Sequence, residues 1–152
     1  MPDPVSLTVT STDKHYSVAD VRTVELARHA ADNGELIVAE SGAQVPFTVA
    51  RYFAVKAPAG ANRGNHAHRF CSQFLICAHG AVDVVCTDGT NERTFVLDRS
   101  NLGLMIPPNI WNTIIYRQKD TVLVVLCDRP YEVEDYIRDY PEFLALQKAG
   151  RS

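Results

Sequence analysis

The sequence predicts an all-β domain, a small sandwich or barrel that ends in a short helical segment. Three observations point to this fold. Short apolar runs rich in Val, Ile and Leu follow one another at roughly ten-residue spacing, a pattern typical of sandwiches and barrels. Turn residues such as Gly, Asp and Asn stand between these runs, and no internal repeat or low-complexity segment interrupts them.

The first elements are a mobile tail and a hairpin. Residues 1–12 are rich in Ser, Thr and Pro, and we expect them to be mobile. Strands are expected at residues 24–26 and 35–40, on either side of Asn33-Gly34. An Asn-Gly pair between apolar runs favours a type I′ turn, which needs positive φ at both central residues.

The middle of the chain contains the remaining strands. A third strand is expected at residues 46–55, and the loop at 56–65 leads into a strand that contains two histidines. Six more strands are expected at the runs QFLICA, AVDVVC, RTFVL, GLMIPP, WNTIIY and TVLVVLC. After them, apolar residues from Tyr136 to Leu146 fall at helical spacing, with Pro141 as a break or as the start of a second helix. We expect this segment to pack on the outside of the barrel.

Length, charge and cysteine content limit the class of protein. At 152 residues the chain suits one domain, which we place at residues 13–152. The net charge of −3 gives no basic surface that would attract nucleic acid or an anionic membrane. The four cysteines form no Cys-x-x-Cys pair, which favours buried free thiols over zinc or disulfides. No signal-peptide pattern or membrane-spanning run is visible, so we expect a cytoplasmic protein.

The stretch GANRGNHAHRFCSQFLICAHG, residues 60–80, is the most informative of the chain. In a strand, alternate side chains share a face, so His66 and His68 are expected to point the same way. Two such imidazoles are metal ligands, proton-transfer groups or packed core residues. An unliganded histidine titrates near neutral pH and can both accept and donate a proton.

The spacing of Gly60, His66 and His68 resembles the first motif of the cupin jelly rolls, and GLMIPPNIWN stands where their second motif would be. Metal-binding cupins add a glutamate and a third histidine. This chain has Ser72 or Gln73 at the first of those places and Asn112 at the second. Because two histidines with neutral side chains make a poor site for Mn, Fe or Zn, we expect no metal.

Within the cupins, the chain resembles the WxcM-like nucleotide-sugar 3,4-ketoisomerases that act on dTDP-4-keto-6-deoxyglucose. The resemblance spans roughly residues 22–146 and rests on the blocks DNGELIVAE, PFTVARYF, RGNHAH with SQFLIC, and YEVEDYIRDYPEFL. It implies that the ketone moves from C4 to C3 through an enediol intermediate, without a cofactor. The family's catalytic residues would then be His66, His68 and Tyr52.

The resemblance also implies a substrate-binding set. Arg63, just before the histidines, would bind the diphosphate or steady the enediolate, and Lys56 would assist it. Gln73, Trp111 and Asn112 would contact the sugar or base. Ser72 and Asn112 differ from many relatives, so the product configuration at C4, gluco or galacto, is left open.

Two alternatives remain beside the ketoisomerase. One is a non-catalytic module that binds sugar nucleotides. The other is an epimerase of the same fold, which needs a histidine–aspartate couple, and no aspartate partner is visible in the sequence. Finally, an open jelly roll leaves strand edges that a partner can cover, so we expect a homodimer in which N-terminal strands are exchanged.

Overall fold

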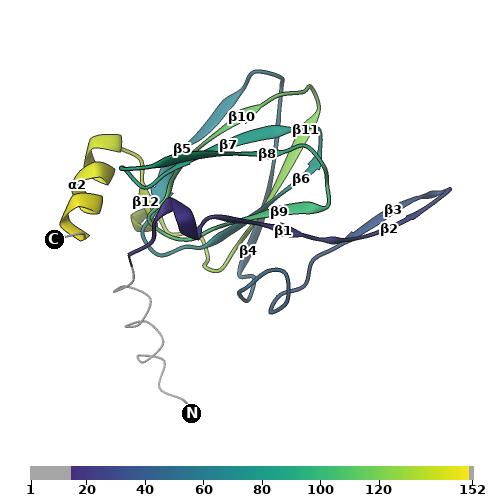
Figure 1. Ribbon diagram of the computed structural model, residues 1–152, viewed down its shortest axis with the longest axis horizontal. Coiled ribbons are helices and arrows are strands. Elements are labelled where there is room, and N and C mark those ends of the chain that lie inside the picture. The colour runs from purple at the N-terminus through teal and green to yellow at the C-terminus, as the bar shows by residue number, and fades with distance from the viewer. Residues whose placement is uncertain (1–14, 151–152) are drawn as a thin grey trace, which may run out of the picture.

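The computed structural model describes residues 15–150, which form two antiparallel sheets packed face to face and a projecting hairpin (Figure 1). The sheets have the strand orders β1-β9-β6-β11-β4 and β12-β5-β10-β7-β8. The strands are β1 (Arg22–Glu25), β2 (Ala27–Ala31), β3 (Gly34–Val38), β4 (Arg51–Ala57), β5 (Asn62–His68), β6 (Gln73–His79), β7 (Val82–Thr87), β8 (Glu92–Leu97), β9 (Leu102–Ile106), β10 (Trp111–Tyr116), β11 (Thr121–Cys127) and β12 (Tyr136–Ile137). From β4 to β7 and from β8 to β11, each connection crosses between the sheets. This is the expected jelly roll, and its sheets do not close into a continuous barrel.

The core lies between the sheets because alternate residues of each strand point inward. Leu123 and Val125 of β11 are buried there, as are Val82 and Val84 of the opposite sheet. The four cysteines are free and buried, as the sequence predicted.

The outer face of the β1-β9-β6-β11-β4 sheet is apolar as well. Residues 39–50 form a loop, so β4 starts at Arg51 rather than at the predicted residue 46. Val45 from this loop packs with Leu26 and Phe74 in a second cluster. Gly103 allows this packing, because a Cβ at that position would lie 2.3 Å from the Phe74 ring.

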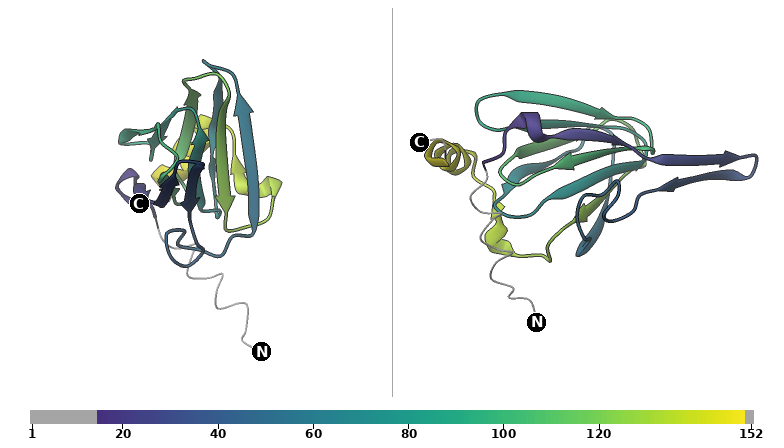
Figure 2. Two further views of the ribbon diagram at one scale, coloured as in Figure 1. Left: turned by 90° about the vertical axis from the view of Figure 1, so that its right-hand side faces the viewer. Right: turned by 60° about the horizontal axis from the view of Figure 1, so that its bottom comes forward.

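The predicted hairpin is present, but its details differ. It is formed by β2 and β3, which pair with each other over Ala27↔Val38 to Ala31↔Gly34 and with no other strand of residues 15–150. Gly34 has positive φ, whereas Asn33 does not, so the type I′ turn at Asn33-Gly34 was wrong. The hairpin projects well beyond the sandwich (Figure 2, right).

The C-terminal segment also differs from the prediction. The short helix η2 (Val133–Asp135) is followed by β12, so Tyr136 and Ile137 are strand residues rather than helical ones. β12 pairs with the end of β5. Within residues 15–150, α2 (Tyr140–Gly150) is the only α-helix, and Pro141 lies in its first turn, where a missing N–H costs nothing. No helix within residues 15–150 is long and apolar enough to span a membrane.

Candidate active site

A cavity of about 200 Å³ opens between the two sheets near His66. Its walls are apolar, and they include Phe53, Val55, Leu75 and Ile114. Seven polar or aromatic side chains complete the lining: Arg63, His66, Gln73, Asn112, Tyr116, Tyr136 and Arg138. Pockets for drug-sized ligands are about 300–1,000 Å³, so this cavity suits a single small ring rather than a whole nucleotide.

His66 is held as a neutral imidazole. Its Nδ1 lies 3.1 Å from the carbonyl oxygen of Gly64, to which it donates, so Nε2 carries the lone pair. Burial lowers the pKa of His66 to about 4, and the nearby charges of His68 and Arg138 act in the same direction. A ring nitrogen with a free lone pair in an apolar cavity can accept a proton.

The backbone before His66 is shaped for this contact. Gly64 has φ +83°, and the β5–β10 pairing shifts register between Asn112 and Thr113. A Cβ at position 64 would lie 2.9 Å from Oδ1 of Asn112. Asn112 itself is buried, and its Nδ2 has no hydrogen-bond partner among the described residues. An unpaired buried donor of this kind is costly unless a ligand supplies the acceptor.

His68 lies behind His66 and does not line the cavity. Its ring is 5.0 Å from that of His66, and the residue is only 3% exposed. Nδ1 of His68 lies 2.6 Å from Oδ2 of Asp135, and its buried Nε2 has no hydrogen-bond partner in the described part of the chain. Burial raises the pKa of Asp135, but hydrogen bonds from His68 and from the N–H groups of Phe70 and Cys71 outweigh it and lower that pKa. Asp135 is therefore a carboxylate that fixes the orientation of His68.

The same place has the residue types of a metal site. Ligand atoms of His68, Cys71 and Asp135 lie within 4.8 Å of one another. Both carboxylate oxygens of Asp135 already accept hydrogen bonds, from the His68 ring and from the N–H groups of Phe70 and Cys71. Because three donors already engage the Asp135 carboxylate, we assign it to the orientation of His68.

Tyr136 lies beside both histidines. Its ring centroid is 5.2 Å from that of His66 and 4.4 Å from that of His68. Its hydroxyl oxygen accepts a hydrogen bond of 3.4 Å from Nη2 of Arg51, and the guanidinium of Arg138 lies over its ring at 4.4 Å.

The structure brings together some of the predicted site residues and separates others. His66, Arg63, Gln73 and Asn112 line one cavity, with His68 directly behind.

The other three predicted residues lie elsewhere. Tyr52 is on the outward face of β4 and is 61% exposed, and Lys56 shares that face. Neither can reach a ligand held by His66 of the same chain. Trp111 packs in a separate cluster with Ala67, Ile137 and Phe143.

Sequence reasoning missed Asp135, Tyr136 and Arg138. They belong to the block YEVEDYIRDYPEFL, which carried the family resemblance but was interpreted as helix. Tyr136 and Arg138 are two residues apart, a spacing that places both on one face of a strand. That spacing was the available signal.

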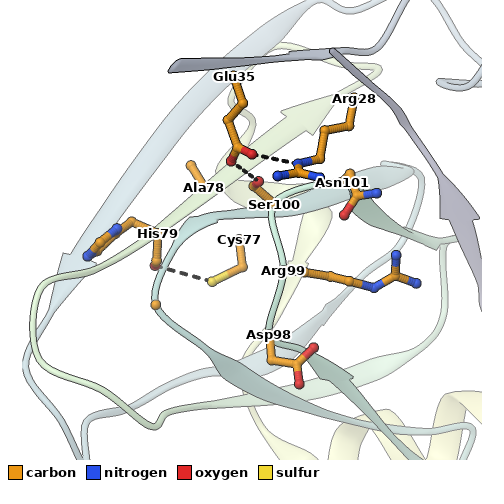
Figure 3. A pocket seen from close by; sticks show the side chains of 10 residues that line it. Arg28, Glu35, Cys77, Ala78, His79, Asp98, Arg99, Ser100 and Asn101 are labelled. Atoms are coloured by element: carbon orange, nitrogen blue, oxygen red, sulfur yellow. Dashed lines mark hydrogen bonds and ion pairs between the residues drawn. The ribbon is translucent and has the colours of Figure 1, made fainter. Parts of the chain in front are cut away.

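A wider hollow of about 530 Å³ lies at the base of the hairpin (Figure 3). Its carboxylate Glu35 accepts hydrogen bonds from Arg28 and Ser100. Arg99 forms an ion pair with Glu25. Because these charges are satisfied locally, the hollow is a weaker candidate for a site than the cavity at His66.

Comparisons with known proteins identify the family of this chain. The family model described as FdtA: WxcM-like, C-terminal matches residues 19–148. The curated TDP-4-oxo-6-deoxy-alpha-D-glucose-3,4-oxoisomerase of Aneurinibacillus thermoaerophilus is 32% identical over 124 residues, covering 77% of this chain and 89% of that protein.

Solved structures give the same picture. A 3,4-ketoisomerase from Helicobacter canadensis is 32% identical with a TM-score of 0.81, over 85% of this chain and 98% of that one. The sugar 3,4-ketoisomerase QdtA from Thermoanaerobacterium thermosaccharolyticum, in complex with TDP, is 28% identical with a TM-score of 0.83. That match covers 87% of this chain and 97% of QdtA.

Proposed function

The chain belongs to the FdtA-type, WxcM-like C-terminal family, and we infer from this membership that it is a TDP-sugar 3,4-ketoisomerase. Its proposed reaction moves the ketone of a TDP-4-keto-6-deoxyhexose from C4 to C3. The observation that carries the proposal is a neutral histidine, His66, which lines a cavity of sugar size and whose Nε2 bonds to no other described residue.

The chemistry requires proton transfer and no net oxidation. A base removes the proton from C3, an enediol or enediolate forms, and a proton is returned at C4 while the oxygens exchange one proton. His66 is the proposed carbon base, because its Nδ1 is engaged with Gly64 and its Nε2 can only accept. No redox cofactor or metal enters this scheme.

His68 and Asp135 support the base from behind. His68, which the sequence predicted to be catalytic, contacts His66 from outside the cavity, and its buried Nε2 has no hydrogen-bond partner among residues 15–150. The His68–Asp135 couple also corrects the sequence-based argument against an epimerase, since an aspartate partner does exist. The ketoisomerase is favoured over the epimerase by the relatives above rather than by the lack of this couple.

Substrate binding is assigned to the polar groups of the cavity and its rim. Asn112 and Gln73 are proposed to contact sugar oxygens, the first through its unpaired Nδ2. Arg63 and Arg138 are exposed at the rim and form no ion pair with any residue of 15–150. Two guanidinium groups that have no carboxylate partner in this range suit the diphosphate of the substrate. We keep three predicted site residues only as groups that could contact a substrate bound to another subunit: Tyr52, Lys56 and Trp111.

We also propose a homodimer, with the β2–β3 hairpin as the exchanged element. The hairpin pairs only with itself within residues 15–150, and Leu36 on it is 60% exposed. An isolated hairpin is marginally stable in water, so a second chain would stabilise it. Residues 1–14, which include the predicted mobile tail, lie outside the described residues. The predicted cytoplasmic location stays a proposal, consistent with four free thiols.

Sedimentation velocity tests the dimer. The full chain should sediment as a dimer, and a variant with residues 28–37 replaced by a Gly-Ser turn should sediment as a monomer. A monomeric full chain would exclude strand exchange.

Proton NMR of TDP-4-keto-6-deoxyglucose incubated with the protein in D₂O tests the function. We expect signals of a 3-keto sugar, with deuterium at C4 to the extent that the base exchanges with solvent. The coupling constants of H4 assign the gluco or galacto product.

Other outcomes would identify the alternatives. Exchange at C5 would indicate an epimerase, and line broadening without any conversion would indicate a binding module. Stoichiometric Fe, Mn, Ni or Zn in the active protein would contradict the metal-free mechanism.

A further inference from the structure

The isomerisation needs a base that removes the proton from C3. It also needs a group that donates a proton to one sugar oxygen and accepts one from the other. The family resemblance placed a tyrosine at position 52, which could hydrogen-bond or protonate a sugar oxygen, but that side chain faces away from the cavity. Another tyrosine, Tyr136, lines the cavity and contacts both histidine rings.

We propose that Tyr136 is a catalytic residue that exchanges protons with the sugar oxygens, and that Arg51, balanced by the sulfur of Cys127, positions its hydroxyl. This inference rests on the proposed ketoisomerase function. It goes beyond that function because it names Tyr136 as the general acid and Arg51 and Cys127 as the groups that position it.

The placement of Tyr136 is fixed by strand pairing. In the β12–β5 pair Tyr136 is opposite His68, and Ile137 is opposite Ala67. Directly opposed residues in a sheet share a face, so Tyr136 lies on the histidine side and Ile137 on the other. Ile137 is accordingly buried in the cluster with Ala67 and Trp111.

Arg51 approaches Tyr136 from the neighbouring sheet. Its Nη2 donates to the Tyr136 hydroxyl oxygen at 3.4 Å and to Cys127 Sγ at 3.6 Å. No carboxylate pairs with Arg51 among the described residues, and its Nε is buried without a partner. A half-buried guanidinium needs a counter-charge close by.

Cys127 is placed to supply that charge. It is fully buried, and its sulfur also receives Nε2 of Gln73 at 3.8 Å. Hydrogen bonds from Cys71 and then from Arg51 stabilise the thiolate and lower the pKa of Cys127 to about 6. The guanidinium of Arg51 thus donates to both the sulfur of Cys127 and the hydroxyl oxygen of Tyr136.

This arrangement suits a tyrosine that alternates between acid and base. Burial raises the pKa of Tyr136, so the resting group is a neutral phenol that can donate. The hydrogen bond and the charge of Arg51 act in the opposite direction and stabilise the phenolate once it forms.

The proposed steps balance. His66 takes the C3 proton as the Tyr136 hydroxyl gives its proton to the C4 oxygen, which yields a neutral enediol, an imidazolium and a phenolate. The phenolate then takes the proton of the C3 hydroxyl as the imidazolium returns a proton to C4. Both residues end in their starting states, and the ketone has moved.

Tyr136→Phe tests the catalytic role, with Tyr131→Phe as the matched control. The Tyr131 ring lies 5.6 Å from that of Tyr136 at an interplanar angle of 45°, and the guanidinium of Arg51 lies over it, but Tyr131 is exposed and outside the cavity. We expect Y136F to lower kcat at least about a hundredfold while KM changes less than about threefold, and Y131F to keep near-normal kcat. A kcat within about threefold of wild type in Y136F would overturn the assignment.

The positioning roles have a separate readout in the basic limb of the kcat–pH profile, which reports loss of the Tyr136 proton. Arg51→Gln should move this limb to higher pH, and Cys127→Ser should move it to lower pH, because the two charges act on the phenol in opposite directions. Cys77→Ser, another buried cysteine in the same sheet, should leave the limb in place. Unmoved limbs in both R51Q and C127S would overturn the positioning roles.

The experiments distinguish failure of the Tyr136, Arg51 and Cys127 assignments from failure of the proposed ketoisomerase function. A wild-type protein that does not convert the substrate would overturn both. Turnover by wild type that Y136F retains would overturn this inference alone.

Discussion

The acidic limb of the pH–rate profile is the most direct test of His66 as the base. The base must be unprotonated, so activity is present above its pKa in the free enzyme and is lost as pH falls through that value. Burial holds the pKa of His66 at about 4, well below its ordinary value of 6.5. At about pH 5.5 nearly all of a histidine with the lower pKa is neutral, whereas about a tenth would be neutral at the ordinary value. The structure therefore predicts about tenfold more activity at that pH than an exposed histidine would give.

The assay is kcat/KM from about pH 4 to 8, measured by NMR or a coupled transaminase. Arg138→Gln should move the acidic limb to higher pH, because it removes a positive charge that lowers the pKa of His66. Arg63→Gln is the control, since it lines the same cavity but is not among the main charges acting on that ring. A wild-type limb near pH 6.5 would refute the reasoning, because the base would then be in a different environment.

Three further predictions follow from the same contacts. His66→Asn and His68→Asn should each lower kcat at least about a hundredfold with unchanged circular dichroism, and near-normal turnover would remove that histidine from the mechanism. Asp135→Asn should lower both kcat and the melting temperature, because it removes the charge that orients His68; an unchanged kcat would leave Asp135 a purely structural role. Gly103→Ala should lower the free energy of unfolding by about 1–3 kcal/mol, because the added Cβ meets the Phe74 ring; an unchanged urea midpoint would show that the ring can move aside.

The sequence predicted the parts of the fold that depend on local pattern. Alternating apolar residues and turn residues identified the strands between residues 51 and 127, and the His66–His68 spacing identified the strand that carries the site. The outward direction of Tyr52 was also readable in principle, because Phe53 and Val55 occupy the inward positions of the same strand. Tyr52 was assigned to the site from the family resemblance, although the alternation of side chains along the strand places it on the outward face.

The rest could not be read from one sequence because it depends on pairing between distant segments. Asp135 is 67 positions from His68, and no local pattern shows that η2 and β12 fold over the end of β5. The same pairing explains why the two histidines differ. β12 covers His68 and leaves His66 in the open cavity. The two histidines therefore share a strand face but have different roles, His66 as the proposed base and His68 as a buried neighbour.

The C-terminal segment is therefore part of the site. The register of β12 against β5 is more important for the site than the helix α2. A shift of one residue in β12 would turn Ile137 toward the histidines and Tyr136 away from them. Asp135 holds the register, since its Oδ1 accepts the N–H groups of Phe70 and Cys71 and its carbonyl accepts the N–H of Arg69. One carboxylate thus orients His68 and fixes Tyr136 in the cavity. For this reason D135N should reduce activity by two routes, and a double variant D135N/Y136F should lose less than the product of the two single losses.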